Sequence, residues 1–304
     1  MEKLGLGKRM ESVNKNISIF FNTRSGSGKC RGAQICNYIN ANANPADGYE
    51  NDVCIWVKRP PYYPDTNVLV SKIPKHSYID IVDGDGLLPF IRENPNIGVI
   101  ASSSLSKEYL DELCASKEIS NKVVFIPHHH CNYERIKRPD REVKTVGFIG
   151  CPGGYGALPE TLEKDLAAIG LEFKYKVRYK NRMEVSDFLQ TIDIQVCYRD
   201  FISIYKGNKR RLRQISRHIK LKNPLKLANG GSFGIPTIAY PEPNYKNDFD
   251  GCFAEAHKPE DIITQCKRLK EDSAYYNDIA NKAMERAERF HIENIAPLYY
   301  SLGN

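Results

Sequence analysis

The sequence predicts an α/β protein built from two Rossmann-like domains that face a cleft. Short apolar runs alternate with helix-forming segments along most of the chain, as in proteins with parallel sheets. The chain has 304 residues, 41% of them hydrophobic, which is enough for two compact domains with separate cores. A charged segment at 133–144 has no strand signal, and the alternating pattern restarts after it. We therefore predict domains at 1–140 and 141–304.

The N-terminal half contains five apolar runs that predict strands. The expected strands are 17–21, 53–57, 79–82, 97–101 and 123–127, and the expected helices are 31–39, 87–92 and 107–114. Ser104 precedes the last of these helices, and its hydroxyl suits an N-cap because it can accept a hydrogen bond from a free backbone N–H.

The C-terminal half repeats the alternation. The expected strands are 145–150, 173–177, 194–198 and 237–240, and the expected helices are 158–169, 185–192, 259–269, 273–290 and 292–302. A further short helix near 224–233 ends at Gly234, which can supply a left-handed stop. Two successive Rossmann-like units of this kind bind ligands at the carboxyl ends of their strands, and this predicts a site in the cleft between them.

Cysteine content and hydropathy limit the class of protein. The nine cysteines form no CxxC pair and are odd in number, so neither a disulfide framework nor a zinc ribbon is expected. No stretch approaches the roughly 20 apolar residues of a membrane-spanning helix, and the first residues lack an apolar signal core. We expect a soluble, cytoplasmic protein with reduced core cysteines.

The positive charge of the chain is concentrated in one region. The formal net charge is +7, and the window 201–241 contains no Asp or Glu. The basic run at 206–222 has two interpretations: a solvated helix face, or a surface that meets phosphates of a nucleic acid, another anionic polymer or a membrane. The cations of this run are Lys206, Lys209, Arg210, Arg211, Arg213, Arg217, Lys220 and Lys222.

The helix after this run carries a candidate phosphate site. Lys226 and Asn229 are three residues apart and therefore share one helix face, next to the strand predicted at 237–240. A cation and an amide on one face suit a ligand that carries phosphate and hydroxyl groups.

A second candidate phosphate site follows the first strand. Gly26, Ser27 and Gly28 lie in a loop that leads into a helix, where free backbone N–H groups can meet an anion. The loop is not a Walker A motif, because Thr23 and Cys30 stand where Gly and Ser or Thr are needed. The alternatives are a glycine-rich loop that approaches a diphosphate or a sugar, and a tight turn without a ligand.

Acidic and histidine residues follow other strands. Asp83 and Asp85 form a DxD triplet after a strand, where they could act as an acceptor-side base or sugar contact, or only form a turn. His128 belongs to three consecutive histidines, and neighbouring residues of an extended segment point to opposite sides, so no metal site is expected. We predict Asp83, Asp85 and His128 as catalytic candidates.

The C-terminal half offers further phosphate contacts. Gly153 and Gly154 lie in a glycine-rich turn after a strand, which allows close approach of a phosphate or base. Arg178 follows the next strand, and Arg199 the one after it. These side chains are either surface charges or cations at the edge of the cleft.

The arrangement resembles the GT-B glycosyltransferases, in particular the group-1, family-4-like retaining enzymes. In that family a Pro-x-Lys-x-x-Glu helix precedes Gly-x-Pro and a short strand, and here Pro224, Lys226, Gly234 and Pro236 stand in register. Asn229 replaces the glutamate that would hold the donor ribose, and an amide can still bind a hydroxyl.

The resemblance implies roles for several of the candidate residues. Lys226 would bind the donor diphosphate, with Arg178, Arg199 and Lys222 as helpers, and Gly26 and Gly28 would lie over the phosphates. The terminal helices are similar to those that return to the N-terminal domain, which would be the acceptor side. The resemblance also implies retention of configuration, and neither a bound metal nor a cofactor besides the nucleoside diphosphate sugar.

Two functions from different classes follow. The first is a glycosyltransferase that moves a sugar from a nucleoside diphosphate sugar to an acceptor that the sequence does not identify, with an anionic polymer, a nucleic acid and a lipid-linked acceptor all open. The alternative is a nucleic-acid-binding protein that uses the basic run at 206–222 without catalysis, although the sequence contains no known nucleic-acid-binding motif.

Overall fold

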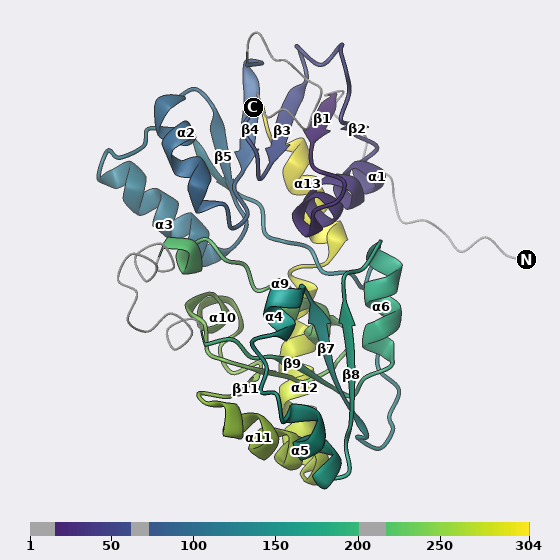
Figure 1. Cartoon of the computed structure of the whole chain (residues 1–304). Coiled ribbons are helices and arrows are strands. Elements are labelled where there is room, and N and C mark those ends of the chain that lie inside the picture. The colour runs from purple at the N-terminus through teal and green to yellow at the C-terminus, as the bar shows by residue number, and fades with distance from the viewer. Residues whose placement is uncertain (1–15, 62–72, 201–216, 304) are drawn as a thin grey trace, which may run out of the picture.

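A computed structural model describes residues 16–61, 73–200 and 217–303 (Figure 1). The described chain forms two lobes, and each contains one parallel sheet. The polypeptide passes between the sheets at 126–144, and the predicted boundary at residue 140 lies inside this connection. The α/β fold class with two Rossmann-like units is confirmed.

The first sheet has six parallel strands in the order β2-β1-β3-β4-β5-β6. Its strands are β1 (Ile17–Phe20), β2 (Asn42–Ala43), β3 (Val53–Val57), β4 (His76–Asp80), β5 (Gly98–Ala101) and β6 (Val123–Phe125). Three of its strands, β1, β3 and β5, are buried along their whole length, and β4 is buried except for its first residue, which explains their apolar runs. The expected strand at 79–82 begins and ends earlier in the structure, and the two-residue strand β2 was not predicted.

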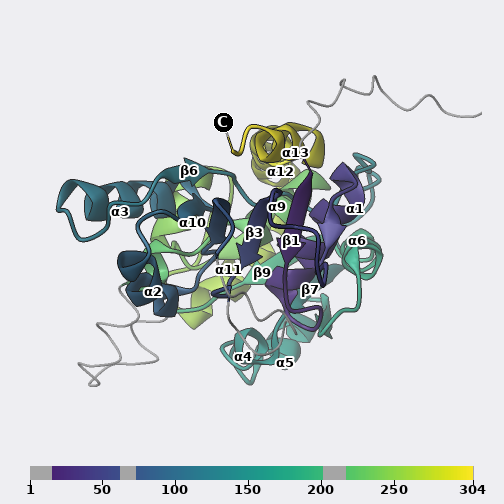
Figure 2. The same cartoon turned by 90° about the horizontal axis from the view of Figure 1, so that it is seen from above.

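Helices cover both faces of the first sheet. They are the π-helix η1 (Gly28–Gln34), α1 (Ile35–Ile39), the short 3₁₀ helix η3 (Asp85–Leu87), α2 (Leu88–Glu93) and α3 (Ser104–Ala115). The view from above shows α2 and α3 on one side of the sheet and α13 (Ile292–Tyr300) on the other (Figure 2). The N-cap of α3 is Ser103 and not Ser104: the Ser103 hydroxyl accepts from the Ser106 N–H, and the Ser106 hydroxyl accepts from the Ser103 N–H.

The second sheet has five parallel strands in the order β11-β10-β9-β7-β8. Its strands are β7 (Thr145–Gly150), β8 (Glu172–Val177), β9 (Ile194–Cys197), β10 (Thr237–Ala239) and β11 (Ala254–Glu255). The helices of this lobe are α4 (Pro152–Tyr155), α5 (Leu162–Ala168), α6 (Arg182–Gln190), α9 (Leu225–Ser232), α10 (Pro243–Phe249), α11 (Pro259–Glu271) and α12 (Ser273–Glu288). The sequence did not predict α4, α10 or β11, which are short.

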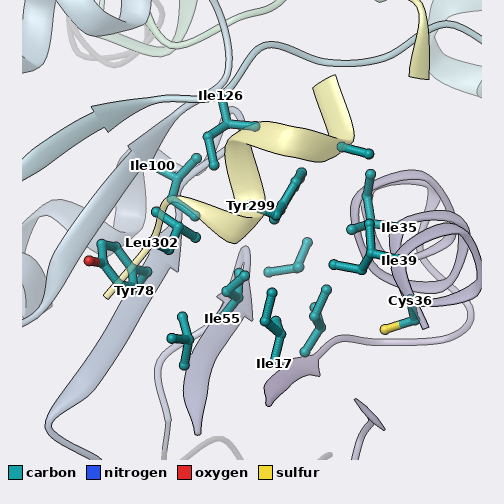
Figure 3. Close-up of a cluster of buried hydrophobic side chains, with 14 of the residues drawn as sticks. Ile17, Ile35, Cys36, Ile39, Ile55, Tyr78, Ile100, Ile126, Tyr299 and Leu302 are labelled. Atoms are coloured by element: carbon teal, nitrogen blue, oxygen red, sulfur yellow. The ribbon is translucent and has the colours of Figure 1, made fainter. Parts of the chain in front are cut away.

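The last helix returns to the first lobe, as the family resemblance implied. α12 packs against α9 of the second lobe, whereas α13 contributes Ile292, Ile295 and Tyr299 to the core of the first lobe. Figure 3 shows Tyr299 and Leu302 among side chains of the first sheet. The first lobe therefore needs the end of the chain to complete its core. No helix within the described ranges is both long and apolar enough to cross a membrane.

Candidate functional site

A cavity of about 600 Å³ lies between the lobes, beyond the carboxyl ends of strands from both sheets. Cations dominate its described lining, and Asp83 is the only carboxylate among the described lining residues. We call it the cationic cavity. The cations that line it are Arg24, Lys29, Arg178, Arg182, Arg199, Lys222 and Lys226. Such a lining favours an anionic ligand, because fixed positive charges in a partly desolvated cleft attract phosphate strongly.

Lys226 projects from α9 into the cationic cavity. Its Nζ lies 4.8 Å from the centre of the Phe148 ring, and burial lowers the pKa of the ammonium group below its usual value. Gly150 and Gly154 lie beside this Nζ, and a Cβ at either would be at an ordinary contact distance from it, 3.4 and 3.6 Å. Gly154, however, belongs to α4 rather than to the expected open turn, and neither Gly154 nor exposed Gly153 lines the cavity.

Arg199 and Lys222 lie beside a buried carboxylate that sequence analysis missed. Glu242, only 2% exposed, accepts from Arg199 at 3.3 Å through Oε1, and its Oε2 has no hydrogen-bond partner. Burial lowers the pKa of Lys222 to about 8, partly offset by the charge of Glu242. Glu242 follows β10. Its position just after a predicted buried strand could have indicated that it belongs to the site, because several of the other candidate residues also follow strands.

Arg178 has an unusual backbone conformation at the edge of the cationic cavity. Its φ is +66°, a left-handed value that is uncommon for a residue other than glycine. Its backbone N–H donates to the Gly150 carbonyl at 3.2 Å, directly after β8 pairs with β7. Strained residues of this kind cluster at binding sites, and this one places a guanidinium-bearing residue in the cavity lining.

The loop after β1 contains two residues that line cavities and one that only shapes the turn. Gly26 lines the cationic cavity, and Ser27 lines an adjoining cavity. Gly28 is buried and lines neither cavity. A Cβ at this position would lie 1.9 Å from the Asn22 carbonyl oxygen, so the backbone turn has space only for glycine. Gly28 therefore serves the tight turn, which was one of the two interpretations open from the sequence.

Lys29 connects the two lobes at this loop. Its Nζ donates to the Tyr179 carbonyl of the second lobe at 2.6 Å. Arg182, also from the second lobe, donates to the Cys131 carbonyl at 2.8 Å and pairs with Glu134 at 2.7 Å. These bonds hold the loop after β8 and the start of α6 against the first lobe and the connecting segment.

The adjoining cavity, of about 890 Å³, lies on the side of the first sheet. Asp85 and His128 line it, and Asp83 lines both cavities. Lys58 pairs with Asp83 at 2.5 Å, and although burial raises the pKa of this carboxyl, the Lys58 charge holds it below its usual value. The three catalytic candidates thus lie near one another, where the first sheet meets the cationic cavity. Sequence analysis missed Lys58, which follows a well-predicted strand.

Asn229 lines the cationic cavity, but its side chain is also engaged elsewhere. Its Oδ1 accepts from the backbone N–H of Cys131 at 2.9 Å, which ties α9 to the segment between the lobes. The amide nitrogen of Asn229 is therefore the group left to meet a ligand hydroxyl.

At the described end of the basic run, Lys220 lies in an exposed ion pair on the first lobe, whereas Leu221 and Lys222 face the interior. Lys220 pairs with Glu112 at 3.2 Å and lies 4.8 Å from the centre of the Tyr109 ring. Leu221 is fully buried in the core of the first lobe, and Lys222 lines the cationic cavity. The hypothesis of a nucleic-acid surface at 206–222 thus gains no support at 220–222, and residues 206–216 lie outside the described part of the chain.

The histidines and cysteines carry no metal site in the described ranges, where groups of three or more His, Cys, Asp or Glu that could hold an ion are absent. His128, His129 and His130 are all buried, and burial lowers the pKa of each, so they are neutral at pH 7. All nine cysteines are free thiols, and Cys151 alone is exposed.

Comparison with known proteins identifies the fold. No protein-family model and no curated protein matches the sequence. Anabaena HepE in complex with UDP and glucose has a TM-score of 0.58 at 12% identity, over 94% of this chain and 98% of that one. WaaG, a glycosyltransferase involved in lipopolysaccharide biosynthesis, has a TM-score of 0.53 at 8% identity, over 95% of this chain and 100% of that one.

A larger structure, the GtfA/B complex, has a TM-score of 0.46 at 10% identity, over 84% of this chain and 53% of that one. This chain thus spans about half the length of that protein. The two full-length superpositions show that the chain has the GT-B fold, as the sequence resemblance predicts.

Proposed function

We propose that this protein is a glycosyltransferase that uses a nucleoside diphosphate sugar as its donor. One observation carries the proposal: in a GT-B fold, the described lining of the cavity between the lobes has seven cations and one carboxylate, with Glu134 and Glu242 outside the lining as partners of Arg182 and Arg199. As its bond to the sugar breaks, the leaving diphosphate gains one negative charge, and cations fixed around it stabilise that charge. The structures of similar fold include one in complex with UDP and glucose, which supports a nucleotide sugar here.

Lys226, Arg199 and Lys222 would stabilise the departing diphosphate. In the reaction, the bond between the anomeric carbon and the β-phosphate oxygen breaks, and its electron pair leaves with the nucleoside diphosphate. The oxygen of an acceptor hydroxyl forms the new bond to the anomeric carbon. Asp83 is the proposed base for the hydroxyl proton, because it lines both cavities and its lowered pKa keeps it ionised at neutral pH.

The proposed reaction uses protein cations in place of a metal ion for charge stabilisation. Addition of EDTA should therefore leave donor cleavage unchanged, which an assay of nucleotide release with and without the chelator measures.

The first experiment is a thermal-shift screen with UDP, GDP, ADP, CMP and their sugar conjugates. A ligand that binds only the folded state stabilises it by about 2.7 kcal/mol at one hundred times its dissociation constant. We expect one nucleoside diphosphate and its sugar conjugate to raise the melting temperature. DNA and anionic vesicles serve as parallel wells. A shift with DNA or vesicles alone, and with none of the nucleotides, would contradict the proposed donor.

A further inference from the structure

The adjoining cavity described above is lined by a different balance of charges from the cationic cavity. It lies against the carboxyl ends of β3 and β4, and it shares Asp83 and Gly26 with the cationic cavity. We call it the acceptor cavity. Its described charged residues are Lys58, Arg59, Asp83, Asp85 and His218. A molecule bound there would lie next to whatever occupies the cationic cavity.

The charges of the acceptor cavity balance. Lys58 pairs with Asp83 at 2.5 Å, and His218 approaches Asp85 at 3.8 Å. Burial lowers the pKa of His218, so this ring is neutral at pH 7. Two cations, Lys58 and Arg59, then stand against two carboxylates among the described lining residues. The cationic cavity, by contrast, has seven cations and one carboxylate in its described lining.

Two residues that line the acceptor cavity have strained, left-handed backbone conformations. Lys58 and Val82, which follow the neighbouring strands β3 and β4, have φ values of +54° and +52°. A left-handed conformation is a genuine outlier for a β-branched residue such as valine. These two turns bring Lys58 and Asp83 together at the edge of the sheet, a placement that packing of the strands alone does not require.

A buried polar side chain also opens onto this cavity. His128 is 3% exposed, lines the acceptor cavity, and has no hydrogen-bond partner at Nδ1. A neutral imidazole can either donate to or accept from a hydroxyl group. Hydroxyl and amide groups of Asn22, Ser25, Ser27 and Asn223 complete the polar lining.

We propose that the acceptor cavity binds a neutral saccharide, whose hydroxyl groups receive the glycosyl group. This proposal rests on the proposed function and names the acceptor class of the same site. Saccharide hydroxyls both donate and accept, which matches paired carboxylates, cations and a neutral imidazole. An anionic acceptor would approach Asp83 and Asp85, and Lys58 is already neutralised by its ion pair with Asp83.

The test uses matched acceptors with the donor that the nucleotide screen identifies. Methyl glucoside, methyl N-acetylglucosaminide, maltose and lactose are the neutral probes. Glucuronic acid, glucose 6-phosphate and a single-stranded oligonucleotide are the anionic probes. The readout is the rate of nucleoside diphosphate release above that with water alone, together with mass spectrometry of the product. We expect at least one neutral saccharide to give a rate at least tenfold above every anionic probe.

A charge-neutralising variant sharpens the test. Asp85→Asn removes one carboxylate from the acceptor cavity and should lower the ratio of neutral to anionic acceptor rates at least fivefold. Asp111→Asn is the matched control, because Asp111 is exposed on α3 and pairs with Lys107 outside both cavities. Each variant is checked for a wild-type melting temperature. An unchanged ratio in a folded Asp85→Asn protein would overturn the proposal.

Failure of this inference is distinguishable from failure of the proposed function. If no nucleotide sugar is bound or hydrolysed, the proposed function itself fails, and the acceptor proposal falls with it. If the donor is hydrolysed but an acid or the oligonucleotide is the best acceptor, or if no neutral saccharide raises the rate, only the acceptor class is overturned.

Discussion

Two buried groups of charges in the second lobe differ in how fully they are paired. Asp193 is 1% exposed, and its two oxygens accept from Arg138, Arg141, the Thr145 hydroxyl and the backbone N–H groups of Lys144 and Thr145. At the cationic cavity, by contrast, Lys226 lies over a ring, and Glu242, the partner of Arg199, has one unpaired oxygen. A buried charge whose hydrogen bonds are all made is typical of a group that stabilises the fold. Buried charges with unpaired atoms are typical of binding sites, where a ligand can supply the missing partner.

The pKa directions agree with this difference. Burial alone raises the pKa of Asp193, but the hydrogen bonds to Lys144, Arg141 and Thr145 hold it at about 2. Burial lowers the pKa of Lys226 and Lys222, and no partner of either reverses that effect. The native state thus stabilises the charged form of Asp193 and destabilises the charged forms of the two lysines.

The largest effect on stability is expected at Asp193. Asp193→Ala leaves the buried guanidinium of Arg138 and two backbone N–H groups without their acceptor, and it should lower the free energy of unfolding by about 3–5 kcal/mol. Urea denaturation measures this loss. The control is Asp278→Ala, which removes an exposed ion pair on α12 and should change the free energy of unfolding far less, because solvent screens that pair. Equal losses in the two variants would contradict the structural role of Asp193.

The next effect concerns catalysis and not stability. Lys226→Ala should lower turnover about 10²–10³-fold, because a cation aimed at the leaving diphosphate acts mainly in the transition state. Its melting temperature should stay close to that of the wild type, because the fold already disfavours this buried charge. Steady-state kinetics and thermal unfolding measure the two quantities. Lys282→Ala, on the exposed surface of α12, is the control. Turnover near the wild-type rate in Lys226→Ala would contradict the assignment.

The smallest effect is a pH dependence of nucleotide binding. The pKa of Lys222, about 8, lies below its ordinary 10.5, so the side chain is charged below pH 8 and becomes neutral above it. Glu242, Arg199, Asp83 and Lys226 surround it and set this value. Affinity for the nucleoside diphosphate should therefore fall as pH rises above 8, by at most about tenfold per pH unit.

Calorimetric titrations between pH 6.5 and 9.5 test this dependence. Lys222→Arg should flatten the fall above pH 8, because a guanidinium stays protonated over this range. A wild-type affinity that remains constant across the range would show that the charge of Lys222 does not contribute to binding.

Comparison of the predicted and observed fold shows which helices and strands can be predicted from local patterns of apolar residues. The apolar runs at 53–57 and 145–150 predicted β3 and β7 to the residue, since fully buried parallel strands need continuous apolar side chains. The short elements β2, α4, α10 and β11 were not predicted. Two to seven residues are too few to show a helical or strand period of apolar residues.

The site was predicted in part. Lys226 was assigned to the site from its helix, Arg178 and Arg199 from their positions after strands, and Lys222 from the family resemblance; all four line the cationic cavity. Gly28, Gly153 and Gly154 were assigned to the same site and do not line it, because a glycine serves a turn as readily as a ligand.

The sequence by itself determined the fold class and the main cations of the cavity between the lobes, because the period of apolar residues and the order of strands depend on local spacing. Only the tertiary structure decided which charges are paired. Glu242 beside Arg199, Lys58 beside Asp83 and His218 beside Asp85 join residues 43, 25 and 133 positions apart in the chain. No local pattern encodes such pairs, since they arise only when strand ends from distant segments meet at one edge of a sheet.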